Sequence, residues 1–573
     1  MSEASSTNKM LGEFYTPSRV VKSFHSLIAD TLGENFYDEY VVWDPAWGTG
    51  NLTNGYSFKE LYCSTLREFD LRKSRNVSRD AEKFQYDFLN DDVSQLISIQ
   101  NRLTEPYKMP EGILEAINNN KKILFLMNPP YAGVGNFGAF DNGSKSGATV
   151  SGIKETMTND KMGSASDNLY SQFMYRIISM KKAYNLDNIA IAIICPPQYL
   201  TVNSYEQFRS EYLSNFKFEQ AKLIRADEFD GLCKDWGISL SVWTSGETPQ
   251  NDRNRFVHKC ISYDDRDNEV FVTNKSIYNT DGLERACDWA RDLSKQTARE
   301  YLPVFTSGCK MKDRSLTGLT DALAYMGNKS NNVQHNEKEV LIVSGCYSDG
   351  CGIPVTKESF DGIIMYYTAR KLFTRQYQGW INDKDEYIKP LIESTDPEVQ
   401  KALEILKTDG LVFTIFNQSG HTSSMKNSYY IDANGGKVTK RCVNNMFWAT
   451  KDYVLGLADG KISDSDFATD TERYAALKLK EYYNNGLLSE KAIAVLKMAS
   501  DIYRETFSLR DKFHNEVDSS FEVINWDAGW YQIRQIVKQY DMDRFKEFNA
   551  CYKELWDYLQ QTECVYKSGM LIK

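Results

Sequence analysis

The sequence lacks the cysteine and histidine spacing that structural zinc sites use. Its eleven cysteines include no Cys-x-x-Cys pair, the closest two being Cys346 and Cys351, and its five histidines are dispersed. A structural zinc ion needs four such ligands brought together, usually from closely spaced pairs. We therefore predict no metal site. Thiols spread singly in this way are typical of a reducing compartment.

The chain also lacks any apolar run of membrane-spanning length, and its first residues, Met1 to Met10, are polar. We therefore expect a soluble, cytoplasmic protein. Basic residues are not in excess: 68 Lys and Arg stand against 78 Asp and Glu, a net charge of −10. Because nucleic-acid binding gains much of its affinity by neutralising phosphates, this balance counts against a protein that coats nucleic acid. It still permits a basic cleft on an acidic body.

The composition is that of an ordinary globular protein. Of the 573 residues, 42% are apolar and 25% are charged, which suits roughly two to four domains. The pattern along the chain predicts an α/β region over residues 1–247, a mixed α+β region over 248–463 and a helical region over 464–573. An apolar stripe at helical spacing in the last region indicates core packing and comprises Ala492, Val495, Leu496, Ala499, Ile502 and Tyr503.

The first region alternates short apolar strands with longer helical stretches, which predicts a mostly parallel sheet covered on both faces. The expected strands are Tyr40–Trp43, Leu61–Leu66, Ile123–Met127, Ile189–Cys195, Gln220–Arg225 and Ile238–Thr244. The last two lie close together in sequence, which favours an antiparallel edge strand. Residues 132–167 are rich in Gly, Ser, Asn and Thr and lack apolar periodicity. Such a segment is either a disordered insertion or a functional lid, and its position favours a lid.

Three short motifs follow expected strands of this sheet. In Asp44-Pro45-Ala46-Trp47-Gly48-Thr49-Gly50, a strand ends in a carboxylate and enters a glycine turn, where cofactors bind in open α/β sheets. After the second strand, Glu68 could accept hydrogen bonds from both hydroxyls of a ribose. Asp87, which follows later in the sequence, could accept a hydrogen bond from the amino group of an adenine ring. Each of these signals is weak when it stands alone.

The most specific motif is Asn128-Pro129-Pro130-Tyr131, directly after the strand Ile123–Met127. The two prolines fix the backbone torsion φ and hold Asn128 and Tyr131 rigidly at the mouth of the sheet. The Asn128 side-chain oxygen and the Pro129 carbonyl could together accept both protons of an exocyclic amino group. Tyr131 offers a flat face on which a base can stack.

With these motifs in this order, the chain resembles the amino-methyltransferases, and within them the γ group of N6-adenine DNA methyltransferases. The resemblance covers about the first 245 residues. It implies an S-adenosylmethionine-dependent (Rossmann-like) catalytic domain over 1–247 and a target-recognition region over 248–463, with S-adenosyl-L-methionine as cofactor and double-stranded DNA as substrate. It implies catalytic roles for Asn128, Pro129, Pro130 and Tyr131. The cofactor-binding residues that it implies are Tyr15, Thr16, Pro17, Asp44, Ala46, Gly48, Gly50, Glu68, Asp87, Phe88, Asn128 and Leu169.

One residue departs from the family pattern, and one assignment rests on position alone. Trp47 stands where the family has a small residue or Cys, and it is expected to narrow the cofactor pocket. Trp236 lies near the place where relatives carry an aromatic that packs on the second face of the target base, although a core tryptophan is an equal interpretation.

The target adenine must leave the duplex, because pairing otherwise engages its amino group. The reaction needs no general base before methyl transfer and no metal.

Sequence readout is expected in the second half of the chain, where basic and aromatic residues interleave. The DNA-binding candidates are Arg370, Arg375, Lys426, Lys440 and Arg441. Solvated loops are an equally good interpretation of these segments, and the recognised sequence cannot be read from them.

The alternatives are an RNA adenine or protein glutamine methyltransferase, which uses the same motif, and an inactive DNA-binding modification subunit that needs a partner. Methylation of cytosine N4 more often uses Ser as the first motif residue. A fused nuclease is disfavoured, since Asp385-Glu386-Tyr387-Ile388-Lys389 lacks the expected spacing. A cognate restriction endonuclease would then be encoded separately, unless the enzyme is solitary or phage-borne.

Overall fold

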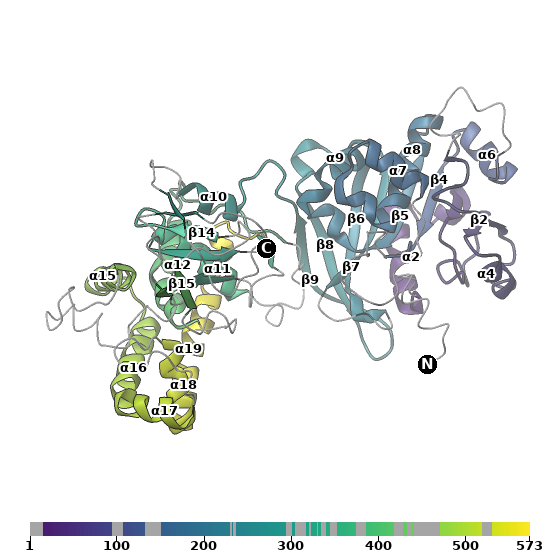
Figure 1. Cartoon of the computed structure of the whole chain (residues 1–573). Helices are drawn as coiled ribbons and strands as arrows, with labels where there is room; N and C mark the ends of the chain where they lie inside the picture. The colour runs from purple at the N-terminus through teal and green to yellow at the C-terminus, as the bar shows by residue number, and fades with distance from the viewer. Residues whose placement is uncertain are drawn as a thin grey trace. The chain divides into compact units, whose positions relative to one another are not determined.

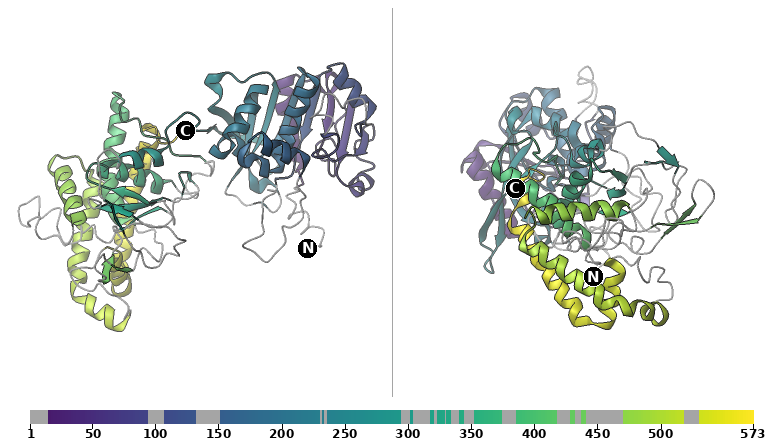
Figure 2. Two further views of the ribbon diagram at one scale, coloured as in Figure 1. Left: turned by 45° about the horizontal axis from the view of Figure 1, so that its top comes forward. Right: turned by 90° about the vertical axis from the view of Figure 1, so that its left-hand side faces the viewer.

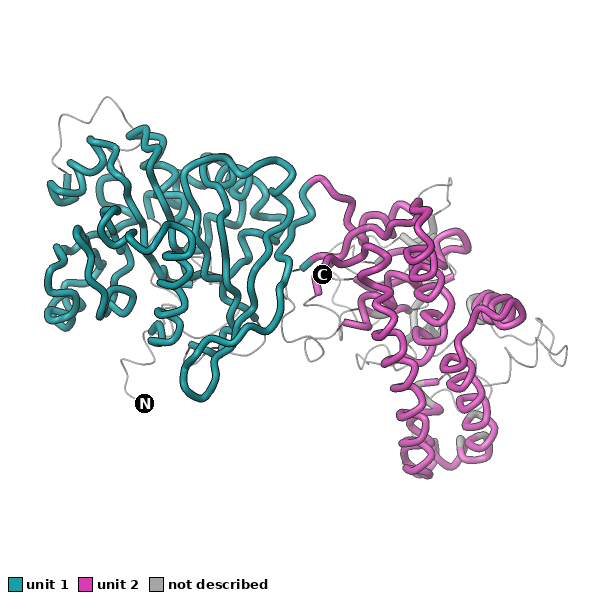
Figure 3. Tube along the Cα trace, turned by 180° about the vertical axis from the view of Figure 1, so that it is seen from behind, with its two compact units in different colours: residues 1–281, 379–385, 573 teal, residues 282–378, 386–572 magenta. Residues whose placement is uncertain are grey.

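The computed structural model describes residues 15–93, 107–131, 151–229, 232, 236–293, 301–303, 317–319, 323–328, 330–333, 340–343, 352–373, 385–417, 428–431, 437–440, 470–517 and 530–573. The chain forms two compact units (Figure 3). Unit 1 comprises residues 1–281, 379–385 and 573, and unit 2 comprises residues 282–378 and 386–572.

Unit 1 is built on a sheet in which the described residues form nine strands, in the order β3-β2-β1-β4-β5-β7-β6-β8-β9. The first five strands are parallel, and β7 runs antiparallel between β5 and β6. Strand β8 is parallel to β6, and β9 is an antiparallel edge strand. The strands are β1 (Val41–Asp44), β2 (Glu60–Thr65), β3 (Glu82–Gln85), β4 (Ile123–Met127), β5 (Ile189–Cys195), β6 (Phe216–Arg225), β7 (Gly237–Ser245), β8 (Arg255–Tyr263) and β9 (Glu269–Tyr278).

Helices cover both faces of this sheet (Figure 1). On one face, Leu124 and Leu126 of β4 share a core with α2 (Ser18–Leu32) and Phe36 of α3 (Phe36–Glu39). On the other face, Phe125 of β4 belongs to a core built with four further helices. These are α6 (Glu111–Asn118), α7 (Gly152–Asn159), α8 (Leu169–Tyr184) and α9 (Glu206–Asn215), while the short α4 (Glu68–Lys73) follows β2. A strand buried on both faces needs a continuous apolar run, which is what β4 and β5 have.

The predicted fold class, an α/β Rossmann-like sheet followed by a mixed region and a helical C-terminal part, is confirmed. All six expected strands are present, and β4 and β5 have the predicted bounds. The expected antiparallel strand is β7, but it is not an edge strand: it lies between β5 and β6, and β8 and β9 extend the sheet beyond β6. Unit 1 runs continuously to residue 281, beyond the α/β region expected over 1–247. The alternating apolar residues of β8, with Phe256, His258 and Cys260 buried, are the signal for this extension.

The second half of the expected lid is part of the core. Residues 132–150 lie outside the described residues, but 151–167 fold as α7 and a 3-10 turn at Gly163–Asp167. Ile153, Met157 and Ala165 are buried against α8 and its neighbours. The predicted lid is therefore wrong from residue 151 onward, because a few well-spaced apolar side chains suffice to anchor the segment.

Unit 2 contains small antiparallel sheets and longer helices. The strands are β10 (Tyr301–Pro303), β11 (Thr317–Leu319), β12 (Ala324–Asn328), β13 (Val340–Val343), β14 (Gly352–Val355), β15 (Ser428–Ile431) and β16 (Lys437–Lys440). The helices are α10 (Ala286–Leu293), α11 (Phe360–Leu372), α12 (Pro397–Phe416), α15 (Asp470–Asn484), α16 (Glu490–Thr506), α17 (Arg510–Glu516), α18 (Trp530–Tyr540), α19 (Met542–Gln561) and α20 (Cys564–Lys567).

The helices of unit 2 pack around one another. Helices α16, α18 and α19 lie side by side, drawn light green to yellow in Figure 2, and α12 packs against α11, α16 and α19. The predicted stripe on α16 is confirmed as core from Ala492 to Ile502. Residues 282–378 and 386–572 form one compact unit, which includes residues on both sides of position 463. Within the described chain, no helix is both long and apolar enough to cross a bilayer.

Candidate active site

The loop after β1 turns at two glycines that have left-handed backbone torsions. Asp44, the last residue of β1, is buried, and its Oδ1 accepts the backbone N–H of Ala46 at 3.0 Å. Burial raises the pKa of the Asp44 carboxyl to about 8, against the lowering effect of that hydrogen bond. Gly48 and Gly50 have φ of +53° and +82°, the left-handed region that other residues avoid. A Cβ on Gly50 would lie 2.8 Å from the Trp47 ring.

Trp47 supports this loop from within the protein. Its indole is buried in the core that includes α2, and its Nε1 donates to Thr53 Oγ1 at 2.9 Å. The Trp47 side chain therefore packs beneath the glycine turn, and together with Val77 it leaves no room for a Cβ at Gly50.

The two carboxylates that follow β2 and β3, Glu68 and Asp87, have different hydrogen-bond and ion-pair partners. Glu68, in the first turn of α4, pairs with Arg72 at 2.6 Å. Because the Glu68 side chain is exposed, its carboxylate is still within reach of a ligand. Asp87 is half-buried, and its two oxygens accept the Leu89 N–H at 3.1 Å and the Asn90 Nδ2 at 2.7 Å. Phe69, which we did not single out in the sequence, is 68% exposed beside Glu68 and offers a flat face for a nucleobase.

Two predicted cofactor residues belong largely to the core. Phe88 is buried, stacked on Phe173 with ring centroids 5.1 Å apart and edge-on to Trp43 at 5.3 Å. Leu169, the first residue of α8, is half-buried against the same core. Phe88 is thus placed to shape the site through packing, while Leu169 keeps part of its surface open.

The loop after β4 meets the segment before α2. Asn128 Nδ2 donates to Thr16 Oγ1 at 2.8 Å, and the Tyr131 hydroxyl donates to Asn128 Oδ1 at 2.7 Å. Thr16 is buried, Tyr15 is exposed, and Pro17 is the residue that precedes the first turn of α2. Burial raises the pKa of Tyr131 well above its ordinary range, so its phenol stays protonated as a donor. Thr16 and Asn128, 112 residues apart in the sequence, thus belong to one hydrogen-bonded group.

Two aromatic rings from the β6–β7 connection approach Tyr131. Trp236 lies edge-on to Tyr131 with ring centroids 6.5 Å apart, and Phe229 does so at the same distance. The Ala226 N–H donates to the Trp236 carbonyl at 2.9 Å, which closes the connection at its base. Trp236 was predicted near this site, whereas Phe229 was not. Its only sequence signal is its place in the same connection.

The DNA-binding candidates are placed differently from the prediction. Arg370 is 0% exposed in α11, and its guanidinium donates to Asn328 Oδ1 at 2.8 Å and to the Ser330 carbonyl. Its assignment as a phosphate contact is therefore wrong, because the charge is satisfied inside the fold. Lys440 ends β16 opposite Ser428, with its side chain outside the description. The described residues do not include Arg375, Lys426 and Arg441.

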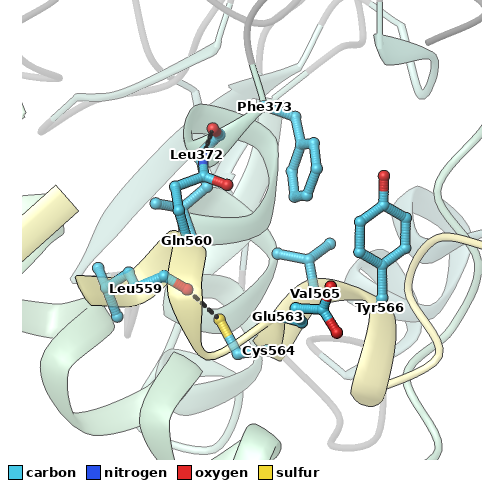
Figure 4. Close-up of a pocket in the computed structure, with 8 residues that line it drawn as sticks. All are labelled: Leu372, Phe373, Leu559, Gln560, Glu563, Cys564, Val565 and Tyr566. Atoms are coloured by element: carbon cyan, nitrogen blue, oxygen red, sulfur yellow. Dashed lines mark hydrogen bonds between the residues drawn. The ribbon is translucent and has the colours of Figure 1, made fainter. Parts of the chain in front are cut away.

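A small cavity of about 180 Å³ lies in unit 2, lined by residues of α11, α19 and α20 (Figure 4). Gln560, on its wall, donates to the Leu372 carbonyl, and none of the predicted site residues lines it.

In the rejected nuclease motif, Lys389 pairs with Glu284 at 3.1 Å, while Asp385 pairs with Lys275 at 2.7 Å. Among the described side chains, no group of three or more His, Cys, Asp and Glu could hold a metal ion.

Comparisons with known proteins give distant structural likenesses only. No family model and no curated protein matches the sequence. Among solved structures, the type IIG restriction endonuclease BpuSI is 12% identical with a TM-score of 0.31, over 82% of this chain and 65% of its own. A modification subunit of a putative type I restriction enzyme from Vibrio vulnificus YJ016 is 14% identical with a TM-score of 0.26, over 61% of this chain and 59% of its own. A putative RNA methyltransferase from Pyrococcus horikoshii is 12% identical with a TM-score of 0.24, over 42% of this chain and 89% of its own. The chain therefore spans less than two thirds of the length of the first two.

Proposed function

We propose that this chain is a DNA methyltransferase that moves a methyl group from S-adenosyl-L-methionine to N6 of an adenine flipped out of the duplex. The observation that carries the proposal is the group of Thr16, Asn128 and Tyr131 beside the glycine turn. Strands β1 and β4 are neighbours and parallel, so Asp44 and Asn128 leave the sheet at the same edge. Neighbouring strands lie about 4.8 Å apart, so the glycine turn and the Asn-Pro-Pro-Tyr loop begin next to each other.

The residues at this edge suit the cofactor. Gly48 and Gly50 let the backbone approach a ligand without a Cβ in the way, and the exposed Glu68 carboxylate can accept two ribose hydroxyls. Phe69 adds a face for the adenine ring. When bound, S-adenosyl-L-methionine supplies an electrophilic methyl group.

The protein's own part is to hold and polarise the amino group. Asn128 Oδ1 and the Pro129 carbonyl each accept a hydrogen bond from one N–H of this amino group. These two hydrogen bonds direct the nitrogen lone pair outward. Tyr131 stacks on the base, and Trp236 and Phe229 lie beside it. Unstacking costs a few kcal/mol, which stacking and these hydrogen bonds offset. Rate enhancement comes from orientation and from preorganised acceptors, with no general base needed before methyl transfer. S-adenosyl-L-homocysteine is the leaving group, and the methylated nitrogen then releases one proton to water.

Residues 248–463 are the proposed target-recognition region, and a cognate restriction endonuclease, if one is the partner, is proposed to be encoded separately. The test is tritiated methyl transfer from S-adenosyl-L-methionine, with unmethylated bacterial DNA, RNA and total protein as parallel acceptors. Label recovered as N6-methyladenine in DNA supports the proposal. Label confined to RNA or protein overturns the substrate, and no label despite cofactor binding indicates a modification subunit that needs a partner.

A further inference from the structure

Thr16 contacts the side chain that carries the proposed chemistry. We infer that Thr16 is a positioning residue: its hydroxyl oxygen accepts a hydrogen of Asn128 Nδ2 and so holds Asn128 Oδ1 toward the target amino group. The contact is 2.8 Å long, and Thr16 is 4% exposed. This inference rests on the proposed function and adds to it the device that orients the acceptor.

Orientation matters because the two ends of a carboxamide have nearly the same shape and opposite hydrogen-bonding character. A half-turn of the Asn128 amide exchanges the acceptor oxygen for an NH₂ donor. An amino group facing that donor would meet N–H against N–H, and its lone pair would not be directed at the methyl group. The half-turn therefore removes the polarisation on which methyl transfer depends.

In this structure two groups hydrogen-bond to the Asn128 amide, and only one of them, Thr16, leaves the oxygen that the base is to use unoccupied. The Tyr131 hydroxyl donates to Asn128 Oδ1 at 2.7 Å, the oxygen that the base is to use. An incoming amino group must share or replace that contact. Thr16 binds the opposite end of the amide, so its contact with Asn128 persists when the base arrives.

Thr16 is itself held firmly. The next residue, Pro17, has φ fixed at −63°, and its carbonyl accepts the Val21 N–H at 3.0 Å at the start of α2. Val20 and Phe24 of α2 are buried in the core beneath β1 and β4. A buried hydroxyl on a packed helix start is a suitable second layer for a reactive side chain, because such supports fix orientation.

The test compares Thr16→Val and Thr16→Ser with Thr280→Val as matched control. Thr280 is also 4% exposed, in the same unit, and its hydroxyl donates to the side chain of Asn203 at 2.9 Å. Single-turnover methyl transfer should fall about 10- to 100-fold in Thr16→Val and change less than about threefold in Thr16→Ser and Thr280→Val. The family resemblance implies a cofactor contact for Thr16, whereas this inference assigns its hydroxyl to Asn128. The dissociation constant of the cofactor should therefore change by less than about threefold in all three. An equal loss of cofactor affinity and rate in Thr16→Val, or no loss of rate, would overturn the inference.

Two further measurements separate this inference from the proposed function. In the Asn128→Ser background, Thr16→Val should change the binding of a flipped base by less than about twofold, measured with 2-aminopurine at the target position, because the partner is already gone. In protein labelled with ¹⁵N-asparagine, the Asn128 side-chain NH₂ should exchange more slowly in the wild type and Thr16→Ser than in Thr16→Val. Equal exchange in all three refutes the contact, even if the wild type methylates no acceptor and the proposed function fails.

Discussion

The hydroxyl of Tyr131 donates to Asn128 Oδ1 at 2.7 Å, so the residue expected to stack on the base also engages the acceptor expected to receive the amino group. The two roles of Tyr131 are separable, because the ring and the hydroxyl are different parts of the side chain. The following variants use this separation and the other contacts of the site.

Tyr131→Phe keeps the ring and removes the competing donor. We expect single-turnover methyl transfer within about threefold of the wild type, while Tyr131→Ala weakens binding of the flipped base by about 10- to 100-fold through lost stacking. Binding is measured with 2-aminopurine at the target position. Equal losses in the two variants would mean that the hydroxyl, and not the ring, is what the reaction needs.

Asn128→Ala removes the acceptor of the amino proton. We expect the rate of methyl transfer to fall by at least about 100-fold, with cofactor affinity nearly unchanged, because the proposed cofactor contacts lie mainly on the loops after β1 and β2. Quench-flow kinetics and calorimetric cofactor titration measure the two quantities. A parallel loss of cofactor affinity would contradict this division of roles.

Gly50→Ala should be far more harmful than Gly55→Ala. Both glycines have positive φ, +82° and +84°, but a Cβ at Gly50 would meet Val77 Cγ1 at 2.7 Å, while a Cβ at Gly55 meets nothing within 4 Å. We expect about 1 kcal/mol of strain at Gly55, and about 1–3 kcal/mol more at Gly50 from overpacking, with weaker cofactor binding. Thermal unfolding and cofactor titration provide the comparison, and similar effects in the two variants would refute this account of the turn.

The stability of unit 1 should depend on pH through Asp44. Burial raises its pKa to about 8 in the folded state, from an ordinary value of 3.8. Between these values the folded state binds a proton that the unfolded state has released, so the free energy of unfolding falls as pH rises. Relative to Asp44→Asn, the wild type should therefore lose stability as pH rises from about 4 to about 8 and level off above that range. Denaturant unfolding at a series of pH values measures this difference, and a constant difference would show that Asp44 is ionised in the folded protein.

Arg370→Met should affect stability and not DNA contact. The guanidinium is buried among Asn328, Ser330 and Tyr366, and its removal leaves the Asn328 oxygen and the Ser330 carbonyl without this donor. Leaving a buried acceptor without its donor costs about 1–3 kcal/mol, so we expect a loss of this size for each of these two acceptors. Unfolding is followed by calorimetry, and DNA affinity is measured at several salt concentrations below the transition. A reduced salt dependence of binding in a fully folded variant would restore Arg370 as a phosphate contact.

How far the sequence predicts this protein depends on the kind of residue. Strands β4 and β5 have the predicted bounds because a strand buried on both faces must be apolar at every position. The glycine turn and the Asn-Pro-Pro-Tyr loop are also local features, since φ at Gly48 and the rigidity at Pro129 and Pro130 depend on the residues themselves. The β6–β7 pair was predicted correctly as well, from two apolar runs close together.

Contacts between distant segments were decided by the tertiary structure. Nothing local to Thr16 points to Asn128, and nothing local to Phe229 points to Tyr131. The same limit explains Arg370, whose basic and aromatic surroundings read as a nucleic-acid surface until α11 is buried by its neighbours. It also explains β8 and β9, which became part of the sheet because β6 offered an open edge. The sequence by itself thus determined the six expected strands and the chemical groups of the site. Which groups meet was decided by packing, because burial and hydrogen-bond partners belong to the folded chain as a whole.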